Sequence, residues 1–540
     1  MLYLLHQAVD RAAEKTPEHE AICYSGQRLT YAALSEQSDR LAYVLHALGV
    51  KRGDRVGMCM NKSLNTPVAL YGIMKAGAVF VPLDPSAPAA RLAFIIRDCG
   101  IRHVITESSK AGLLREFVYS GIDLQSAIGL EPGEGLPTNC VSCAEVSSAP
   151  NRVPDTGIIE QDPAYILYTS GSTGTPKGVV HTHRSALSFA EIAVQTFGFE
   201  SSDRLSNHAP LHFDLSTLDY YSAAIAGATT VIVPEVYTKF PASLSKLMQD
   251  ERLTVFYSVP FALIQLLQYG ALDKRDLSAL RWVIFGGEPF PTGHLRRLME
   301  SLPGARFCNM YGPTEVNGCT YHILPTPPNL TEDSIPIGRL FGNVQALVVG
   351  EDDEPVPYGE VGELLVRSPT MMQGYWGRPD LNTRAFCRRP GVGPVEEVYH
   401  RTGDLVRWDN DGNLLFLGRK DRQVKVRGYR IELDEIEAAL YTHDAVESAA
   451  VLAVQGDDGS KHLEAVVVLK PGSTVQPAEL VRHVSSLLPP YAVPEKVGFL
   501  RSMPRTSTGK VDRIQLQALA RNGSQEWHTE NRTSAISLST

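Results

Sequence analysis

Residues 168–178 carry a dense set of groups that can grip phosphate oxygens, in the order Tyr-Thr-Ser-Gly-Ser-Thr-Gly-Thr-Pro-Lys-Gly. Glycine lets backbone N–H groups approach an anion, hydroxyls add donors, and Lys177 adds a compact positive charge. The pattern is not a Walker loop, because that motif ends in Gly-Lys-Ser/Thr, whereas Pro176 precedes Lys177 here and Gly178 follows it. A solvated Gly/Ser linker is the plain alternative. The apolar run at 164–168, however, is typical of a buried strand and directly precedes the Gly-rich residues. The segment therefore indicates a phosphate-binding loop positioned by that strand.

Two further segments bring together aromatic, hydroxyl and carboxylate groups. Residues 309–315 read Asn-Met-Tyr-Gly-Pro-Thr-Glu, where a tyrosine can stack on a base and a glutamate can bind Mg²⁺. In isolation this segment is typical of a plain Gly-Pro turn. Residues 399–404 end in Thr-Gly-Asp, which alone is also typical of a turn, although its carboxylate can accept two hydrogen bonds.

Charged residues near the C-terminal end form two more candidate segments. Residues 418–432 are rich in Lys and Arg and coincide with a change of composition, which makes them a candidate hinge. Residues 504–512 contain Thr508-Gly509-Lys510 ahead of a basic and polar segment. A lysine on such a loop is ordinarily just solvated, but its charge could also stabilise a departing phosphate.

The elements that must position these segments alternate between strands and helices in the first 340 residues. Apolar residues at helical spacing predict a helix over 30–48 with Thr30 as N-cap. This alternation predicts an α/β fold with parallel strands, and residues 131–158, rich in Pro, Gly and Ser, are expected to be a connection. The strands predicted in this part are 55–60, 78–82, 103–106, 229–234, 254–259 and 281–286.

The character of the chain changes after residue 344. Three segments alternate like antiparallel strands, with turns such as Asp411-Gly412 between them. A boundary near 419–422 predicts domains at 1–420 and 421–520, followed by a polar, disordered tail at 521–540. The elements predicted here are strands at 344–349, 362–367, 413–417, 447–454 and 464–470 and helices from about 434 and at 477–488.

Composition excludes several classes of partner. The formal net charge of −9, without a block of Lys and Arg, argues against nucleic acid. No run of about 18 apolar residues predicts a membrane span. The N-terminal apolar run is too short for a signal peptide, and the eight scattered cysteines fit reduced thiols, so we expect a cytoplasmic protein. The single Cys-x-x-Cys at 140–143 lacks the second pair that a zinc site needs.

Taken together, these segments resemble the adenylate-forming superfamily of acyl-CoA synthetases, luciferases and adenylation domains of nonribosomal peptide synthesis. The resemblance covers about residues 5–515, with the motifs in the family's order. It implies an α/β fold: a large N-terminal domain of parallel-sheet subdomains plus a small β-barrel-like subdomain, followed by a small mobile α+β domain. It also implies that a carboxylate attacks the α-phosphorus of ATP, with Mg²⁺ as cofactor, and that the mixed anhydride then meets a thiol.

The resemblance assigns roles residue by residue. Lys510, Lys177, Thr173 and Glu315 would be catalytic, Glu315 would also hold Mg²⁺, and Asp421 would be the hinge. Family members often have Tyr where this chain has Phe416, so one hydroxyl is missing. The residues implied to bind nucleotide are Thr169, Ser170, Gly171, Ser172, Gly174, Gly287, Glu288, Asn309, Met310, Tyr311, Gly312, Thr314, Asp404, Phe416, Arg419 and Lys425.

Asp214 indicates which acid is activated. A carboxylate beside Phe213 in an apolar setting needs a cation, and in amino-acid-activating members an Asp here binds the substrate's ammonium group; a helix N-cap is the alternative. The residues implied to line the substrate pocket are Phe213, Asp214, Leu215, Leu218, Tyr257, Ile284, Gly286, Met310, Gly318 and Cys319. None is matched to a charged substrate.

The expected substrate is therefore a small neutral amino acid. The pattern begins like that of stand-alone enzymes that load L-proline, from which Gly286, Met310 and Gly318 depart; L- or D-alanine and small branched amino acids stay open. No carrier segment follows residue 520, so we expect transfer to a separate carrier protein, or to coenzyme A, by a monomer or weak dimer. The alternatives are an acyl- or aryl-CoA ligase, against which Asp214 argues, and an inactive nucleotide-binding scaffold.

Overall fold

The computed structural model describes residues 1–171, 174–330, 334–456, 461–506 and 511–521. Internal contacts divide the chain into two compact units. The large unit comprises Met1–Pro85, Ile95–Tyr168 and Gly178–Lys420, and the small unit comprises Ser86–Phe94, Thr169–Lys177 and the segment that begins at Asp421. The predicted α/β class, with parallel sheets and a smaller C-terminal part, is confirmed. Ser172, Thr173, Lys510 and the predicted tail beyond residue 521 lie outside the described residues.

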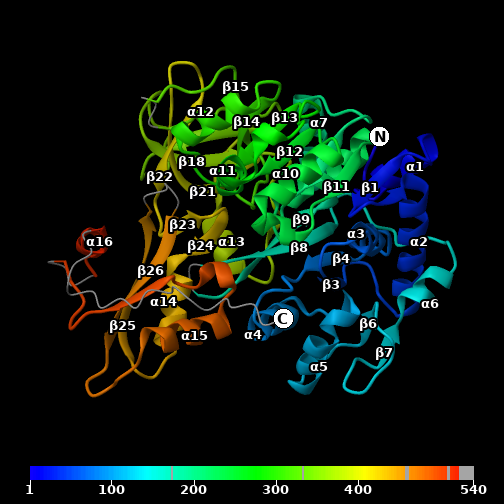
Figure 1. Ribbon diagram of the computed structural model, residues 1–540, viewed down its shortest axis with the longest axis horizontal. Helices are drawn as coiled ribbons and strands as arrows, with labels where there is room; N and C mark the ends of the chain where they lie inside the picture. Colours follow the sequence, from blue (N-terminus) through cyan, green and yellow to red (C-terminus); the bar gives the residue numbers. More distant parts are fainter. Residues whose placement is uncertain (172–173, 331–333, 457–460, 507–510, 522–540) are drawn as a thin grey trace. The chain divides into compact units, whose positions relative to one another are not determined.

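The large unit contains a nine-stranded sheet in the order β16-β15-β14-β13-β12-β10-β11-β1-β2 (Figure 1). Six neighbouring strands, from β14 to β1, are parallel, and the antiparallel strands β2, β15 and β16 lie at the edges. The first strand of the chain therefore pairs with β11, some two hundred residues later, and the two lie side by side in Figure 1. The strands are β1 (Glu20–Tyr24), β2 (Gln27–Thr30), β10 (Arg204–Asn207), β11 (Thr229–Ile232), β12 (Val255–Ser258), β13 (Trp282–Gly286), β14 (Arg306–Tyr311), β15 (Thr320–Leu324) and β16 (Arg339–Leu340).

A second sheet has eight strands in the order β19-β9-β8-β4-β3-β5-β6-β7. The run from β8 to β7 is parallel, so the carboxyl ends of these strands meet at one edge. The strands are β3 (Arg55–Cys59), β4 (Val79–Pro82), β5 (His103–Thr106), β6 (Ser126–Ile128), β7 (Asn139–Val141), β8 (Pro163–Thr169), β9 (Lys177–Thr182) and β19 (Gly374–Tyr375).

The remaining sheets are built from later residues. The segment predicted as a small barrel-like subdomain forms a five-stranded antiparallel sheet, in which Gly412 takes a positive φ in the turn between β21 and β22. In the small unit, β23 and β24 form a hairpin, and β25, β26 and β27 form a three-stranded sheet. The strands are β17 (Gln345–Val349), β18 (Gly362–Arg367), β20 (Phe386–Pro390), β21 (Glu396–Trp408), β22 (Leu414–Arg419), β23 (Gln423–Val426), β24 (Tyr429–Glu432), β25 (Val446–Gln455), β26 (Lys461–Leu469) and β27 (Lys496–Phe499).

Helices connect the parallel strands. The predicted N-cap is confirmed, because the Thr30 hydroxyl accepts a hydrogen bond from the Ala33 N–H at 3.2 Å. Among the described residues, no helix has the length and apolar character that crossing a bilayer requires. The α-helices are α1 (Gln7–Lys15), α2 (Tyr31–Ala47), α3 (Asn65–Lys75), α4 (Ala89–Cys99), α5 (Ala111–Tyr119), α6 (Cys143–Ser148), α7 (His183–Phe197), α8 (Leu215–Thr217), α9 (Ala223–Ala226), α10 (Pro241–Asp250), α11 (Pro260–Tyr269), α12 (Thr292–Ser301), α13 (Pro379–Ala385), α14 (Leu433–Tyr441), α15 (Pro477–Leu487) and α16 (Arg513–Arg521). The other helical turns are η1 (Ser108–Lys110), η2 (Leu218–Ser222), η3 (Glu235–Lys239), η4 (Leu272–Lys274) and η5 (Pro490–Ala492).

One local expectation was wrong, and one plain alternative does not hold. The predicted connection at 131–158 contains β7 and α6, because Ser142 and Glu145 form a reciprocal capping box that starts the helix. The Thr-Gly-Asp sequence at 402–404, typical of a turn in isolation, lies inside the thirteen-residue strand β21. Pairing of β21 with both β18 and β22 there overrides the local turn preference.

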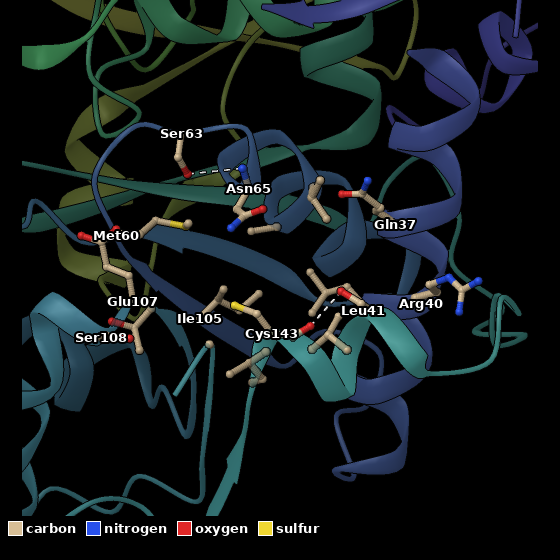
Figure 2. A pocket seen from close by; sticks show the side chains of 17 residues that line it. Gln37, Arg40, Leu41, Met60, Ser63, Asn65, Ile105, Glu107, Ser108 and Cys143 are labelled. Carbon is tan, nitrogen blue, oxygen red and sulfur yellow. Dashed lines mark hydrogen bonds between the residues drawn. The ribbon is translucent and has the colours of Figure 1, made fainter. Parts of the chain in front are cut away.

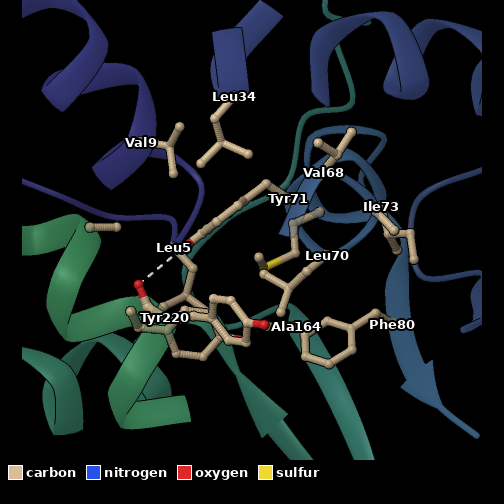
Figure 3. Close-up of a cluster of buried hydrophobic side chains, with 14 of the residues drawn as sticks. Leu5, Val9, Leu34, Val68, Leu70, Tyr71, Ile73, Phe80, Ala164 and Tyr220 are labelled. Carbon is tan, nitrogen blue, oxygen red and sulfur yellow. Dashed lines mark hydrogen bonds between the residues drawn. The ribbon is translucent and has the colours of Figure 1, made fainter. Parts of the chain in front are cut away.

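A large apolar core joins α1, α2 and α3 to strands of both parallel sheets. Figure 3 shows Leu5, Leu34, Val68 and Phe80 around Tyr71, whose hydroxyl donates to the carbonyl of Tyr220 at 3.1 Å. The Tyr71 hydroxyl is thus satisfied inside the core, as burial of a polar group requires. This core holds the two parallel sheets of the large unit together.

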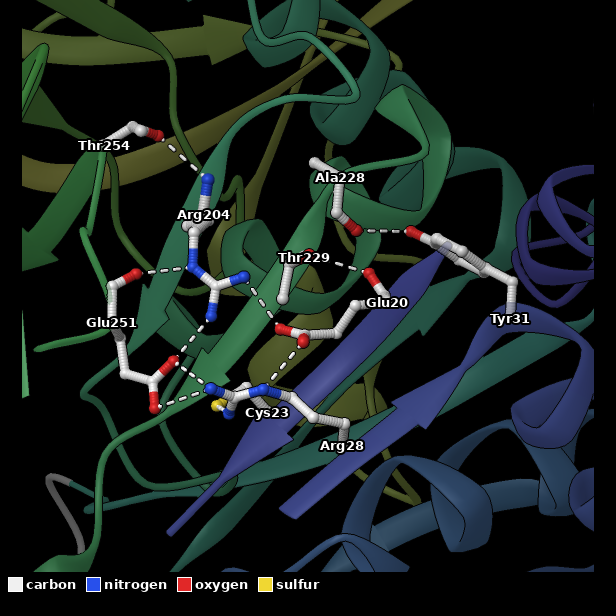
Figure 4. A network of polar contacts seen from close by, with 9 residues as sticks. All are labelled: Glu20, Cys23, Arg28, Tyr31, Arg204, Ala228, Thr229, Glu251 and Thr254. Carbon is white, nitrogen blue, oxygen red and sulfur yellow. Dashed lines mark hydrogen bonds and ion pairs between the residues drawn. The ribbon is translucent and has the colours of Figure 1, made fainter. Parts of the chain in front are cut away.

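A charged network ties the first hairpin to the centre of the nine-stranded sheet (Figure 4). The guanidinium of Arg204, on β10, lies 2.8 Å from the carboxylate of Glu20 and 2.7 Å from that of Glu251. Arg28, on β2, pairs with the same two carboxylates at 2.8 Å each. Burial raises the pKa of the neighbouring Cys23 thiol to about 12, so it stays protonated.

Candidate active site

The parallel strands of the nine-stranded sheet place several predicted substrate residues in adjacent rows. Tyr257 on β12 is the register partner of Ile284 on β13, and Gly286 on β13 is the partner of Met310 on β14. Gly286 ends β13, and Tyr257 and Met310 are each one residue from the carboxyl end of their strands, which is where ligands bind in open α/β sheets; Ile284 lies in the middle of β13. Residues that are 24 or 27 positions apart in sequence thus become neighbours.

One apolar cluster contains four of the ten residues predicted to line the substrate pocket, and a fifth packs against it. Leu218, Tyr257, Ile284 and Met310 belong to it, each at most 6% exposed, and Leu215 packs against it. A methyl group added at Gly318 would lie 3.3 Å from the Met310 sulfur, so Gly318 borders the same cluster. The buried Cys319 backbone N–H donates to the carbonyl of Tyr311 at 2.8 Å.

Asp214 occupies the N-cap position of α8, but its side chain makes no capping hydrogen bond. The alternative role as a helix cap is therefore absent in this structure. The side chain is half-buried, and the Tyr257 pKa is raised well above its usual value by burial and, next, by the charge of Asp214. A carboxylate thus lies at the apolar cluster, where a cationic group of a ligand would be favoured.

Phe213 and Asp214 lie on a turn that follows β10. The Phe213 N–H donates to the carbonyl of Pro210 at 3.0 Å, and the Thr217 hydroxyl donates to the carbonyl of Asp214 at 2.6 Å. The ring of Phe213 meets the ring of His212 edge to face, with centroids 5.2 Å apart. Local hydrogen bonds therefore fix the backbone that carries the carboxylate.

Tyr311, Asp404 and Arg419 form a second polar group. The buried Asp404 carboxylate accepts a hydrogen bond from the Tyr311 hydroxyl and lies 2.5 Å from the Arg419 guanidinium. Tyr311 and Phe416 pack against one apolar cluster, which includes Val316. The structure thus brings together an aromatic ring, a carboxylate and a cation that were predicted to contact nucleotide.

Thr314 and Glu315 are held by two residues that sequence reasoning missed. The Glu315 carboxylate, 1% exposed, accepts a hydrogen bond from the Tyr375 hydroxyl at 2.7 Å. The His181 imidazole lies 2.8 Å from the Thr314 carbonyl, and burial lowers its pKa to about 4, so it is neutral. Two sequence features could have pointed to these residues. They are the His-Thr-His that follows the Gly-rich segment and the Gly-Tyr-Trp at 374–376.

Glycine is sterically required at two predicted site positions. A Cβ at Gly312 would lie 1.5 Å from the carbonyl oxygen of Asn317, and a Cβ at Gly286 would lie 2.2 Å from that of Met310. Both contacts involve backbone that cannot move aside, unlike a flexible side chain. The backbone at Gly312 and at Gly286 can therefore approach the facing carbonyl so closely only because neither residue has a side chain.

The Gly-rich segment lies in the small unit, as defined above. A Cβ at Gly171 would meet the carbonyl of Thr175 at 1.9 Å, and the Gly174 N–H donates to the Gly171 carbonyl at 2.9 Å. The Thr169 hydroxyl is buried and has no hydrogen-bond partner among the described residues. Such an orphaned donor fits a ligand that supplies an acceptor. The Ser170 hydroxyl donates to the carbonyl of Arg430 at 3.0 Å.

The other predicted residues have structural partners of their own. The Asn309 amide donates to the carbonyl of Pro336 at 2.8 Å, and the Glu288 carboxylate accepts from the Phe261 N–H at 3.1 Å, at the start of α11. Gly287 takes a positive φ just after β13. Lys177 begins β9, Lys425 lies in β23, and the Asp421 carboxylate accepts from the Gln423 N–H at 3.2 Å.

A cavity of about 190 Å³ lies elsewhere in the large unit (Figure 2). Its walls come from α2, α3, α6 and the ends of β5 and β6, with Leu41, Ile105 and Val146 among the apolar residues and Arg40 and Glu107 among the charged ones. Arg40 is already bound to the carboxylate of Glu36 at 2.7 Å. None of the predicted site residues lines this cavity, so it is separate from the candidate site.

Two family models match the chain. Residues 9–376 match the model described as AMP-binding enzyme, and residues 435–510 match that described as AMP-binding enzyme C-terminal domain.

Similar proteins agree with these matches. An L-proline–[L-prolyl-carrier protein] ligase of Pseudomonas fluorescens is 36% identical, over 95% of this chain and 98% of its own length. Linear gramicidin synthase subunits C and D of Brevibacillus parabrevis are 38% and 37% identical, but the chain spans only 6% and 9% of their lengths. Among solved structures, amide bond synthetase McbA from Marinactinospora thermotolerans has a TM-score of 0.84 at 26% identity, covering 95% of this chain and 99% of that one.

Proposed function

The chain belongs to the AMP-binding enzyme family, and from this premise we propose that it activates a small neutral amino acid with ATP. The amino-acid carboxylate attacks the α-phosphorus, aminoacyl-AMP forms and pyrophosphate leaves. The aminoacyl group then passes to the phosphopantetheine thiol of a separate carrier protein, and AMP leaves. L-proline is the substrate that we put first, with L- or D-alanine and small branched amino acids as alternatives.

The observation that carries the proposal is the carboxylate of Asp214 at the edge of an apolar cluster. Its side chain is not used as a helix cap, and its charge acts on the buried Tyr257 hydroxyl. An ammonium group bound there would keep the carboxylate charged in partly apolar surroundings. The surrounding Leu218, Ile284 and Met310 favour an uncharged, apolar side chain on the substrate.

L-proline draws further support from one similar protein. The Pseudomonas fluorescens relative is an L-proline–[L-prolyl-carrier protein] ligase by name, and the chain spans almost all of its length.

For ATP, we propose that Tyr311 stacks on the adenine and that Asp404, oriented by Arg419, accepts the ribose hydroxyls. Their mutual contacts give a preorganised edge on which a nucleoside can dock. The Gly-rich segment, with the orphaned Thr169 hydroxyl and the close approach at Gly171, suits phosphate oxygens. Lys177, Thr173 and Lys510 would neutralise charge that develops on those oxygens.

The residues present fit Mg²⁺ as the cofactor. Among the described residues, no cluster of three or more His, Cys, Asp or Glu could hold a metal alone. Mg²⁺ takes one or two carboxylates and fills its other positions with waters and substrate phosphates, so Glu315 alone is sufficient. When bound, Mg²⁺ neutralises phosphate charge, while Tyr375 orients the Glu315 carboxylate.

We further propose that residues 1–420 and 421–520 are separate domains that change orientation between the two steps, with Asp421 as the hinge. Lys510 would then act in the first step only.

The deciding experiment is amino-acid-dependent exchange of labelled pyrophosphate into ATP, across the L-amino acids, D-alanine and several fatty and aryl acids. Strong exchange with one small neutral amino acid is expected. Asp214→Asn should lower kcat/KM for that amino acid by at least about thirtyfold, whereas Asp273→Asn, at an exposed position, should not. Exchange only with fatty or aryl acids would contradict the proposal and favour a CoA ligase; exchange that is unaffected by Lys510→Ala would contradict the role of Lys510.

A further inference from the structure

Lys62 is a buried lysine with no role in the chemistry proposed above. It lies three residues after the end of β3, in the eight-stranded sheet, and is 6% exposed. Burying an ammonium group is costly unless its charge is satisfied by hydrogen bonds or an opposite charge. The groups that accept hydrogen bonds from the Lys62 ammonium therefore indicate its role.

The Lys62 ammonium binds two consecutive backbone carbonyls in the other parallel sheet. It donates to the carbonyl of Asn207 at 2.9 Å and to that of His208 at 2.8 Å. Asn207 is the last residue of β10, and the chain runs from there directly into the turn that carries Asp214. Lys62 thus holds the point at which the substrate segment leaves its strand.

The side chains of the two carbonyl-bearing residues are fixed as well. The Asn207 amide donates to the carboxylate of Asp219 at 3.2 Å and accepts from the Tyr220 hydroxyl at 3.2 Å. The His208 ring lies 2.9 Å from the Ser258 hydroxyl. Burial lowers the Lys62 pKa to about 8, partly offset by the Asp219 charge, so the ammonium is largely protonated at neutral pH.

A second side chain from the same sheet lies close to the segment further along. The Asp84 carboxylate, two residues after the end of β4, lies 3.6 Å from the His212 imidazole. Lys62 therefore holds the start of the segment 207–214 by hydrogen bonds, and Asp84 approaches it further along, both from the carboxyl edge of the eight-stranded sheet. One sheet supplies the segment and the other supplies its anchors.

We propose that Lys62 is a positioning residue for the amino-acid site, whose hold on the Asn207 and His208 carbonyls sets the place of Asp214. The proposal rests on the proposed function, in which Asp214 binds the substrate's ammonium group. Lys62 contacts no substrate. It acts through the backbone and should affect the amino acid rather than ATP.

The test compares Lys62→Met with Lys75→Met. Lys75 is a matched control: its side chain is fully buried, lies 2.6 Å from the Asp10 carboxylate and also pairs with Asp39, and these two carboxylates lie on α1 and α2 rather than on the segment 207–214. Both variants should lose thermal stability. Lys62→Met alone should raise KM for the amino acid by about tenfold to a hundredfold, with KM for ATP within about twofold of wild type in the same exchange assay. Lys62→Arg, which keeps a cationic donor, should recover part of the loss.

Amide hydrogen exchange gives a readout that is independent of activity. Protection of peptides covering 208–217, where the N–H groups of Phe213, Ser216 and Thr217 are hydrogen-bonded, should fall in Lys62→Met and not in Lys75→Met. Equal protection and equal amino-acid KM in the two variants would overturn the proposal. If Lys62→Met does not fold, the same comparison is made with Lys62→Arg, whose smaller shift in the same direction is expected. A wild-type enzyme without amino-acid-dependent pyrophosphate exchange would refute the proposed function. The amide hydrogen exchange data would still decide whether Lys62 holds the segment.

Discussion

At the scale of single residues, the Asp404 carboxylate joins two predicted nucleotide contacts. It is 5% exposed, receives the Tyr311 hydroxyl and pairs with Arg419. Asp404→Asn would remove the charge that holds Arg419 and would replace one of the two carboxylate oxygens proposed to accept the ribose hydroxyls with an NH₂ donor. We expect KM for ATP to rise by about tenfold or more, since a buried charge-assisted pair is lost.

The measurement is pyrophosphate exchange at varied ATP and fixed amino acid. Asp411→Asn, an exposed position on the hairpin between β21 and β22, is the matched control and should leave KM for ATP unchanged. An unchanged KM in Asp404→Asn would remove this residue from the nucleotide site.

The hydroxyl of Tyr375 is a second group whose removal should lower the stability of the folded protein. Tyr375→Phe would take a donor from the Glu315 carboxylate, which has almost no access to water. A buried acceptor that loses its donor destabilises a protein by about 1–3 kcal/mol. Chemical denaturation should report that loss, while Tyr269→Phe, at an exposed hydroxyl, should be nearly neutral. A Tyr375→Phe variant as stable as wild type would contradict this account of Glu315.

Sequence motifs identified site residues by type, but not the residues that hold them. Tyr375 lies 60 positions from Glu315, His181 lies 133 from Thr314, and Lys62 lies 145 from Asn207. No local pattern encodes such pairings, because they arise only when separate strands meet. The catalytic and binding roles assigned by resemblance stay predictions.

At the scale of elements, the close approach of β13 and β14 depends on glycine. Gly286→Ala would drive a methyl group into the Met310 carbonyl at 2.2 Å, and Gly312→Ala would meet the Asn317 carbonyl at 1.5 Å. Either variant must separate backbone segments, and we expect losses of stability above about 2 kcal/mol. The control is Gly112→Ala in α5, where no atom lies within 4 Å of the added methyl group. That variant should gain about 0.5–1 kcal/mol, because alanine favours the helix.

Thermal and denaturant unfolding of the three variants checks this contrast. A Gly286→Ala protein as stable as Gly112→Ala would show that the strands can move apart at little cost.

Elements with strong periodicity were predictable, whereas those set by neighbours were not. The helix at 31–47 and the strands β3, β5 and β13 follow from apolar spacing and from the Thr30 cap. The Thr-Gly-Asp sequence lies inside strand β21 because pairing with β18 and β22 on its two sides outweighs the local turn preference. The capping box at Ser142 and Glu145 is a local sequence pattern that could have been predicted. The surrounding Pro, Gly and Ser favoured a connection instead.

At the scale of the whole molecule, buried histidines predict sensitivity to acid. Burial lowers the pKa of His6, His183 and His208 to about 3 and that of His181 to about 4, from an ordinary value of 6.5. Below pH 6.5 the unfolded chain binds protons that the folded protein does not, so stability falls as pH falls from 6.5 toward 4. Each histidine contributes up to about 1.4 kcal/mol per pH unit in that window.

Thermal unfolding between pH 7.5 and 4.5 tests this expectation. Tm should be nearly constant above pH 7 and fall steeply below 6.5. A Tm that is flat down to pH 5 would mean that these imidazoles can gain protons in the folded state.

The fold class was predictable because alternating strand and helix patterns demand covered parallel sheets. The order of strands was not, since β1 joins β11 across the sheet and seven strands of the eight-stranded sheet, all but β19, are encoded between them. Nothing in the first thirty residues indicates that pairing.

The place of β1 also has a consequence for synthesis. The ribosome makes the hairpin of β1 and β2 first, yet its partner strand β11 emerges roughly 200 residues later, which is roughly 10–40 s at ordinary rates of translation. During that time one edge of β1 has no native partner, and the charges of Glu20 and Arg28 lack Arg204 and Glu251. The nascent chain therefore carries an unpaired strand edge for most of the time in which its first half is made, and this is the interval in which chaperones would have most to protect.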